Sequence, residues 1–271
     1  MSGGTKDGIR LFISDLDGTL VDKKKQLTPG TISAVARLKA AGIGFTVISA
    51  RPRSGVMPIV ETLKLDVPIG AFNGGTIFKR DGTVLSQHRI PPAVVKGIFE
   101  MAQGLAVAPW LFADDRWFAL AEEGPHFASE RVSSDQAPVV VEDFSAWYDH
   151  ADKITFVSDD PPVLAGLLEK AQAAYGDQAT IGQSQTYYLD VTATPANKGD
   201  GIVALAESFG VPLGQVAVIG DQFNDLPMFA RAAVSIAMGQ APDGVKAKAQ
   251  HVTGANDADG VAQAIDSIIL A

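Results

Sequence analysis

The chain of 271 residues is acidic, with a formal net charge of −9, and 46% of its residues are hydrophobic. This composition excludes a mainly disordered chain, and the negative charge argues against a sequence-independent grip on nucleic acid or on an anionic membrane. Because the sequence has no cysteine, it also excludes disulfides, thiolate metal sites and cysteine nucleophiles.

The first eight residues are small and polar, and no uncharged apolar run elsewhere is long enough to span a bilayer. We therefore expect neither a signal peptide nor a membrane span. Together with the absence of cysteine, this favours a cytoplasmic protein.

The first third of the chain alternates apolar runs with amphipathic segments. A strand that includes Phe12 is followed by a helical stripe over 28–42, a strand at 44–49, an amphipathic run at 56–63 and a short apolar segment at 68–72. This rhythm is typical of a parallel sheet with right-handed crossovers.

From about residue 83 the rhythm changes to that of an α+β insert, which we place at 84–190. Its predicted elements are helices at 92–103 and 162–174 and strands at 109–113, 116–121, 153–157, 179–181 and 186–191.

The parallel pattern resumes after the insert. Its predicted elements are helices at 198–209, 225–231 and 259–270 and strands at 215–219 and 233–237. Residues 1–83 and 191–271 are therefore predicted to form one discontinuous α/β core, with a doubly wound, mostly parallel sheet and an inserted α+β cap.

Two aspartates, one residue apart, follow the first predicted strand. Strand periodicity would put Asp15 and Asp17 on the same side, and Gly18 lets the chain leave the sheet directly after them. Two unit charges about 4 Å apart repel by about 4 kcal/mol at an effective dielectric near 20, so the pair needs a cation or a shared proton. The pattern predicts a metal site or catalytic work, with two solvated aspartates in a turn as the alternative.

A second acidic strand end follows the apolar run at 215–219. If that strand belongs to the same parallel sheet, Asp221 and Asp225 face the same edge as Asp15 and Asp17, and four carboxylates converge. Hard oxygen ligands that retain water match Mg²⁺ better than a softer metal. The sequence therefore predicts Mg²⁺, with simple capping of the next helix by Asp221 and Asp225 as the alternative.

Ser49 and Lys198 add a strand-end hydroxyl and a cation near a helix start. A phosphoryl group in transfer has three peripheral oxygens, each of which needs a donor or a metal. Serine, lysine, backbone amides and Mg²⁺ together satisfy that need. Taken singly, these residues are more often an ordinary strand-end serine and a solvated lysine, so the prediction depends on their combination.

These pieces resemble, in order, the motifs of the haloacid dehalogenase superfamily of phosphohydrolases. The first motif is the Asp-Leu-Asp-Gly-Thr-Leu run at 15–20, the second is Ser49, the third is Lys198 and the fourth is the Gly-Asp-Gln-Phe-Asn-Asp run at 220–225. Within the superfamily the chain resembles the Cof-type branch. A large α/β cap of the C2 kind lies between the second and third motifs of that branch, where the predicted insert falls.

The resemblance implies a division of roles among the acidic residues. Asp15 would attack phosphorus and form an aspartyl phosphate, and Asp17 would be the general acid and base. Mg²⁺ would be held by the carboxylates of Asp15 and Asp221 and the backbone carbonyl of Asp17. Asp225 would complete or orient this shell, and Asn224 would support it.

The remaining predicted site residues concern the phosphate and the substrate. Ser49, Lys198, Gly18 and Thr19 would bind the transferring phosphoryl group. Arg51 would bind a second anionic group of the substrate or pack at the cap hinge, and Asn73 would shape the site through its turn. One departure is Ala50, where the branch commonly has glycine, and alanine limits how closely the backbone approaches phosphate.

We therefore expect a Mg²⁺-dependent phosphomonoesterase for a small organic phosphate, most of all a sugar phosphate. It would act as a monomer or small homo-oligomer, with no nucleic-acid or membrane partner. Two alternatives remain open: a phosphotransferase or mutase that uses the same intermediate, and a receiver-type signalling domain that accepts phosphate on aspartate. The signalling domain explains neither the second acid, Asp17, nor the long insert.

Other residues are predicted to have no catalytic role. Lys23, Lys24 and Lys25 are expected to form a solvated turn. Trp110 and Trp117 are expected to pack inside the cap rather than to bind a sugar ring.

Overall fold

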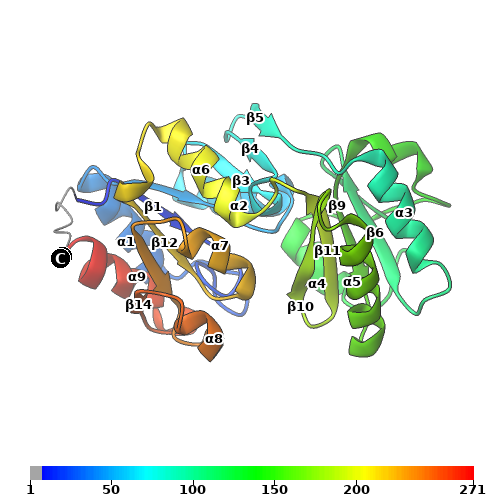
Figure 1. Ribbon diagram of the computed structural model, residues 1–271. Helices are drawn as coiled ribbons and strands as arrows, with labels where there is room; N and C mark the ends of the chain where they lie inside the picture. Colours follow the sequence, from blue (N-terminus) through cyan, green and yellow to red (C-terminus); the bar gives the residue numbers. More distant parts are fainter. Residues whose placement is uncertain (1–7) are drawn as a thin grey trace.

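The computed structural model describes residues 8–271. Residues 1–7 lie outside the described residues. They include most of the small, polar N-terminal residues on which the expectation of no signal peptide was based. The core, formed by both ends of the chain, and the cap, formed by its middle, lie beside one another (Figure 1). Across residues 8–271 no helix is both long and apolar enough to cross a membrane.

The core is built on a five-stranded parallel sheet in the order β14-β13-β12-β1-β2. Ser14, the last residue of β1, is in register with Ile219 of β12 on one side and Val47 of β2 on the other. The carboxyl ends of these three strands therefore meet at one edge, as the sequence predicts. The strands are β1 (Leu11–Ser14), β2 (Gly44–Val47), β12 (Val216–Gly220), β13 (Val234–Ala237) and β14 (His251–Val252).

Alternation along β1 divides the core into two helical layers. Phe12 packs in the cluster that contains α1, α2 and α9, whereas Leu11 and Ile13 pack in the cluster that contains α6, α7 and α8. Successive strand residues point to opposite faces, so a fully apolar strand needs helices on both sides. The helices are α1 (Pro29–Ala40), α2 (Arg53–Leu63), α6 (Lys198–Phe209), α7 (Leu226–Phe229), α8 (Asp243–Lys246) and α9 (Gly260–Ala264).

A small antiparallel sheet of β3 (Ile69–Ala71), β4 (Thr76–Phe78) and β5 (Val84–Gln87) continues the core beyond β2. β5 pairs with β4, whereas β11 (Tyr188–Ala193) is a cap strand. Because β5 belongs to the small sheet of the core, the cap begins after Gln87 rather than at 84. Because β11 belongs to the cap sheet, the cap ends at about Ala193 rather than at 190. The domain division itself stays a proposal.

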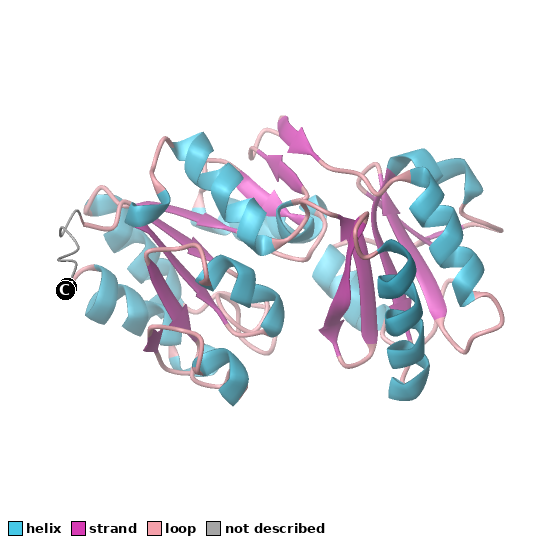
Figure 2. Ribbon diagram, in the orientation of Figure 1, coloured by secondary structure: helices cyan, strands magenta, loops and turns pink. Residues whose placement is uncertain are grey.

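The cap sheet has six strands in the order β10-β11-β9-β6-β7-β8, antiparallel except for the parallel β7–β8 pair. Helices α3 (Pro92–Ala102) and α5 (Pro161–Tyr175) cover the side away from the core, and α4 (Phe127–Ser134) lies on the side toward it (Figures 1 and 2). The other strands are β6 (Ala108–Ala113), β7 (Arg116–Ala119), β8 (Val139–Val140), β9 (Ala151–Val157) and β10 (Ala179–Gln185).

The two faces of the cap sheet bury different side chains. Leu111 and Leu189 pack with α3 and α5, whereas Trp110 and Trp117 are fully buried on the opposite face, in the cluster shared with the core. On that face Phe112 reaches the core, with its ring centroid 6.0 Å from that of Phe72. The tryptophans therefore pack, as expected, and the cap joins the core through aromatic contacts.

Several elements differ from the sequence prediction, which contained no counterpart for β4, β5, β8, β14 and α8. Helix α4 was not predicted because its segment, Phe127–Ser134, carries few apolar residues. The helix expected at 225–231 begins instead as a 3₁₀ turn and continues as the short α7 with Pro227 in its first turn. The closing helix expected at 259–270 consists of the short α9 followed by a π-helical turn, Ile265–Ile269.

Candidate active site

Three of the four predicted motifs line a cavity between the core and the cap, and the remaining one, Lys198, is not among its lining residues but contacts Asp15. The core wall of the cavity comes from segments that follow β1, β2 and β12, and its cap wall from α4, β9, β10 and β11. From the core it is lined by Asp15, Asp17, Lys25, Ser49, Ala50, Arg51, Asp221, Gln222 and Asn224. Residues more than 200 positions apart in the sequence thus share one wall.

Three carboxylates form the centre of the site. Asp15, Asp221 and Asp225 are buried, and each offers an oxygen within 4.8 Å of the others. Gly18 permits this approach, because its φ is +81° and a Cβ there would lie 2.3 Å from Oδ2 of Asp221. The loop after β1 can therefore pack directly against the loop after β12.

Lys198 is the cation of this cluster. It begins helix α6, is 1% exposed, and its Nζ lies 2.6 Å from Oδ1 of Asp15 and 2.5 Å from Oδ1 of Asp225. A buried lysine keeps its proton only when anions surround it. Against the opposing effect of burial, Asp15 and Asp225 raise its pKa.

The cluster holds more negative charge than Lys198 can neutralise. Burial raises the pKa of Asp15, and the neighbouring Asp225 and Asp221 act in the same direction. Burial and Asp225 also raise the pKa of Asp221. The carboxylates are therefore stabilised in their charged form only if a further cation is bound, which is the fit expected for a divalent metal.

Hydrogen bonds distinguish Asp225 from the other two carboxylates. Its Oδ2 accepts the backbone N–H groups of Asp221 and Gln222 at 2.7 and 2.9 Å, and its Oδ1 accepts from Lys198. By contrast, Oδ2 of Asp221 has only a 3.3 Å contact from the side chain of Gln222. Asp15 and Asp221 are therefore better placed to ligate a metal, and Asp225 to orient the loop and Lys198.

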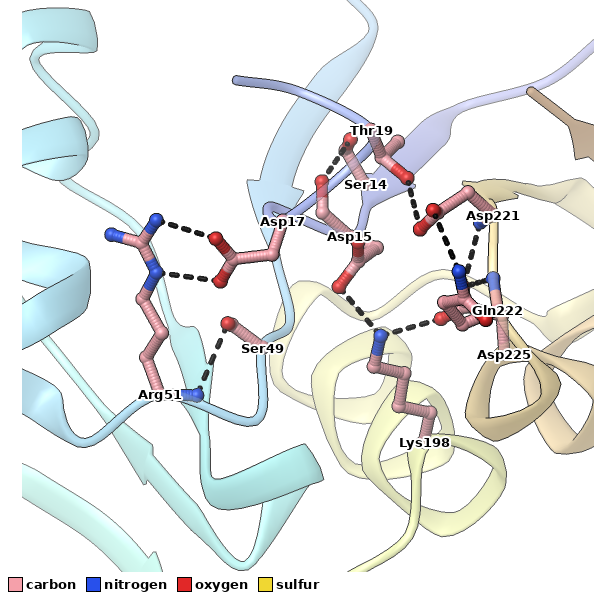
Figure 3. A network of polar contacts seen from close by, with 10 residues as sticks. All are labelled: Ser14, Asp15, Asp17, Thr19, Ser49, Arg51, Lys198, Asp221, Gln222 and Asp225. Atoms are coloured by element: carbon pink, nitrogen blue, oxygen red, sulfur yellow. Dashed lines mark hydrogen bonds and ion pairs between the residues drawn. The ribbon is translucent and has the colours of Figure 1, made fainter. Parts of the chain in front are cut away.

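The structure brings three of the four predicted carboxylates together and directs the fourth away. Arg51 holds Asp17 through two hydrogen bonds of 2.7 Å (Figure 3). Lys25 forms a further ion pair with Asp17. Against the raising effect of burial, Arg51 and Lys25 lower the pKa of Asp17 well below its ordinary value. The expectation that four carboxylates converge is wrong for the Asp17 side chain, because these two cations hold it outside the cluster.

Ser49 and Asn73 lie at neighbouring strand ends. Ser49 is buried on the cavity wall, and its Oγ accepts the backbone N–H of Arg51 at 3.2 Å. Asn73 has a left-handed φ of 57°, and its backbone N–H donates to the carbonyl of Ser49 at 2.7 Å. Asn73 thus fixes the strand end that carries Ser49, consistent with its predicted shaping role.

Gly18 and Thr19 are not among the residues that line the cavity. The Thr19 hydroxyl is buried and donates to Oδ1 of Asp221 at 3.3 Å. Thr19 therefore supports the acidic cluster here, and phosphate binding by these two residues stays a prediction. Asn224 lines the cavity beside Gln222.

Several cavity residues were missed by the sequence analysis. Lys25 was assigned to a solvated turn, but its left-handed backbone, with φ 61°, lies in a tight turn and its side chain reaches Asp17. On the cap wall, Glu130, Lys153 and Tyr188 also line the cavity. The alternation of residues along β11 could have predicted on which face of the strand Tyr188 lies. It could not have predicted that this face of the cap sheet is turned toward the core.

Comparison with known proteins agrees with this geometry. The profile of the haloacid dehalogenase-like hydrolase family matches residues 12–265. The chain is 28% identical over 274 residues to pyridoxal phosphate phosphatase YbhA of Escherichia coli, covering 96% of this chain and 99% of that protein. It is 26% identical over 262 residues to the 5-amino-6-(5-phospho-D-ribitylamino)uracil phosphatase YitU of Bacillus subtilis, covering 93% and 95%.

A solved structure gives the same result for the fold. A haloacid dehalogenase-like hydrolase from Bacteroides thetaiotaomicron superposes with a TM-score of 0.85 at 26% identity, covering 96% of this chain and 99% of that one. The chain therefore belongs to the haloacid dehalogenase-like hydrolases, as its motifs predict. It is an enzyme of the phosphoric monoester hydrolase class, with the cap of the Cof-type branch.

Proposed function

We propose that the protein is a Mg²⁺-dependent phosphatase that hydrolyses a small organic phosphate, most of all a sugar phosphate, through an aspartyl phosphate on Asp15. The observation that carries the proposal is the buried cluster of Asp15, Asp221 and Asp225 around Lys198, at the edge where three parallel strands end. A cytoplasmic location remains part of the proposal, since the sequence has no cysteine.

The metal part of the proposal is supported by the donor set. Asp15 and Asp221 would hold the ion, with the backbone carbonyl of Asp17 as a further oxygen ligand, and Asp225 would orient the shell. When bound, Mg²⁺ would neutralise the charge that builds on the phosphoryl oxygens. Lys198 would contribute a second positive charge beside the same group.

Asp15 is the proposed nucleophile. Its Oδ1 is held by Lys198 at 2.6 Å, while Oδ2 accepts no hydrogen bond from the described residues. The side chain is thus oriented and lines the cavity. Ser49 lies on the same wall, where its hydroxyl can donate to a phosphoryl oxygen.

Asp17 is the proposed general acid and base. In the present conformation, Arg51 and Lys25 keep it ionised, which is the form that accepts a proton from water. Proton donation to the leaving alkoxide requires that Asp17 leave Arg51 and take up a proton. We therefore propose that substrate binding changes this pairing before the first chemical step.

The substrate class rests on the cavity and on the relatives. The cavity is enclosed by a polar cap wall that includes Ser129, Ser133, Ser184 and Gln185. The names of the two relatives above give them phosphate esters of small soluble molecules as substrates, one of which carries a ribityl chain. Polar, hydroxyl-accepting surroundings favour a sugar or polyol phosphate.

The test is phosphate release from 4-nitrophenyl phosphate with Mg²⁺, comparing the wild type with Asp15→Asn. We expect activity in the wild type that EDTA removes and a loss of at least about 10³-fold in the variant. Rapid quenching with [³²P]-labelled substrate in acid should trap a phosphoprotein in the wild type only. Full activity of Asp15→Asn would overturn the nucleophile assignment, and transfer of phosphate to a second alcohol in place of water would favour the phosphotransferase alternative.

A further inference from the structure

The turn that follows Asp15 is held from outside the cavity by the C-terminal part of the chain. Gln240, an exposed residue between β13 and α8, donates from its Nε2 to the backbone carbonyl of Gly18 at 2.5 Å. The Oε1 of Gln240 accepts the backbone N–H of Asn256 at 3.1 Å. The side-chain amide of Gln240 is therefore fixed between two main-chain groups, one from each end of the chain.

The turn needs such an external contact because it contains a glycine. At Gly18 φ is +81°, and a Cβ would lie 2.3 Å from Oδ2 of Asp221, so a side chain has no room. Glycine populates more backbone conformations than any other residue, and local sterics therefore determine the peptide groups beside it only weakly. The carbonyl of Gly18 accepts no other hydrogen bond from the described residues. Gln240 thus supplies a constraint that the glycine itself lacks.

The segment that carries Gln240 also holds the loop after β12. The backbone N–H of Met238 donates to the carbonyl of Gly220, directly before Asp221, at 3.0 Å. The next residue, Gly239, packs so closely on its neighbours that a Cβ there would lie 2.8 Å from the carbonyl oxygen of Thr253. Segment 238–240 is therefore a fixed support that contacts both acidic loops of the site.

Asn256 attaches the far end of the same turn. It is 8% exposed, and its Nδ2 donates to the backbone carbonyl of Val21 at 2.9 Å. Val21 in turn forms an isolated parallel bridge with Asp17. Two side-chain amides from the C-terminal part of the chain thus hold the turn over 17–21, one at Gly18 and the other at Val21.

We propose that Gln240 is a positioning residue for the divalent metal. It would keep the Asp17–Gly18 turn in the conformation in which the backbone carbonyl of Asp17 serves as a ligand together with Asp15 and Asp221. The direction of a carbonyl ligand depends on φ and ψ alone, because the peptide group is planar and has no side-chain torsion to adjust. The inference rests on the proposed function, which makes this carbonyl a ligand. It goes beyond that function by assigning a residue that neither lines the cavity nor belongs to the four motifs.

The experiment measures Mg²⁺ binding by calorimetric titration of the metal-free protein. Gln240→Met keeps a side chain of similar length but removes both hydrogen bonds, and we expect Mg²⁺ to bind about 10- to 100-fold more weakly. The matched control is Gln263→Met. Gln263 is also exposed and donates to one carbonyl, that of Ala258 at 2.7 Å, but no hydrogen bond joins its side chain to either acidic loop among residues 8–271. This control should bind Mg²⁺ as the wild type does.

The metal dependence of activity separates positioning of the metal from a general structural role. In Gln240→Met, the Mg²⁺ concentration that gives half-maximal hydrolysis of 4-nitrophenyl phosphate should rise with the Kd. At saturating Mg²⁺, kcat should return to within about twofold of the wild type. A lower kcat that saturating Mg²⁺ does not restore would overturn the inference, because a merely structural defect is not repaired by more metal.

Binding and turnover together distinguish the failure of this inference from the failure of the proposed function. A wild type that binds Mg²⁺ more tightly than Gln240→Met but hydrolyses no ester would remove the function and keep the inference. Equal Mg²⁺ affinity in Gln240→Met and in an active wild type would overturn the inference alone. A wild type that binds no Mg²⁺ would overturn both.

Discussion

On the core wall of the cavity, charged side chains are already paired with one another, whereas on the cap wall polar groups are left without partners. Lys198 forms ion pairs with both Asp15 and Asp225, and Arg51 forms an ion pair with Asp17. Facing them, the Tyr188 hydroxyl is buried and has no partner among the described residues. The core is thus organised before a ligand arrives, and the cap is completed by one.

This difference follows from what each wall has to recognise. A phosphoryl group is the same in every substrate, so a fixed network of charges can be arranged for it in advance. The leaving group differs among relatives, whose names include a pyridoxal phosphate and a ribityl phosphate phosphatase. In the proposed function the cap wall contacts the leaving group, and on that wall the buried Tyr188 hydroxyl has no hydrogen-bond partner among the described residues.

The largest effect that tests this comparison is expected on the core wall. Lys198→Met leaves Asp15 and Asp225 buried without their cation, so we expect the free energy of unfolding to fall by about 3–5 kcal/mol. Phosphatase activity should fall by about 10²- to 10³-fold, measured under conditions where the variant is folded. Lys170→Met, on the exposed side of α5, is the control. A variant as stable as the wild type would show that the core wall is not preorganised by this pair.

Metal addition should stabilise the acidic cluster in a pH-dependent way. Because the folded-state pKa values of Asp15 and Asp221 are raised, the folded protein binds more protons than the unfolded chain above about pH 4, and its stability falls as pH rises. At 100 times its Kd, Mg²⁺ should raise the free energy of unfolding by about 2.7 kcal/mol. Thermal unfolding with Mg²⁺ and with EDTA should show a larger increase in Tm at pH 8 than at pH 5; an equal increase would argue against these ligands.

Arg51 is expected to affect the proton-transfer step rather than the metal site. Arg51→Leu removes the bidentate partner of Asp17, so the pKa of Asp17 should rise toward its ordinary value and the pH–rate profile should move to higher pH. Because the proposed proton donation requires Asp17 to leave Arg51 and take up a proton, we expect kcat/KM at neutral pH to rise, by up to about tenfold for each unit by which the pKa of Asp17 rises. Arg51→Lys keeps the positive charge but not the two-point contact. Its pH–rate profile should therefore lie between those of the wild type and Arg51→Leu. An unmoved pH profile would contradict the role given to Asp17.

The effect farthest from the cavity is expected where β9 of the cap meets β5 of the small antiparallel sheet. Asp152 of β9 is 2% exposed, and its Oδ1 accepts from Gln87 of β5 at 2.7 Å. Burial raises its pKa to about 6, so its contribution to stability is lost as pH rises from about 4 through 6. Asp152→Asn should therefore gain up to about 3 kcal/mol relative to the wild type at pH 8 and nothing at pH 3. Urea unfolding at both pH values measures this, with the exposed Asp177→Asn as control.

The sequence alone predicted which strand ends lie together at the candidate site. Strand runs that stop at Asp15, Ser49 and Asp221, and a helix that begins at Lys198, are local patterns, and a parallel sheet necessarily brings such ends to one edge. Helix α6 accordingly has the predicted bounds, and the inserted cap lies between the second and third motifs.

Only the tertiary structure decided how these side chains are paired. Asp17 is held by Arg51, 34 residues away, and Asp15 by Lys198, 183 residues away, and no local periodicity encodes which partner a side chain takes. The same holds for Glu130, Lys153 and Tyr188, which meet only because α4, β9 and β11 fold over the core. Strand ends follow from local sequence, whereas the partners of charged groups depend on contacts between distant segments that burial makes strong.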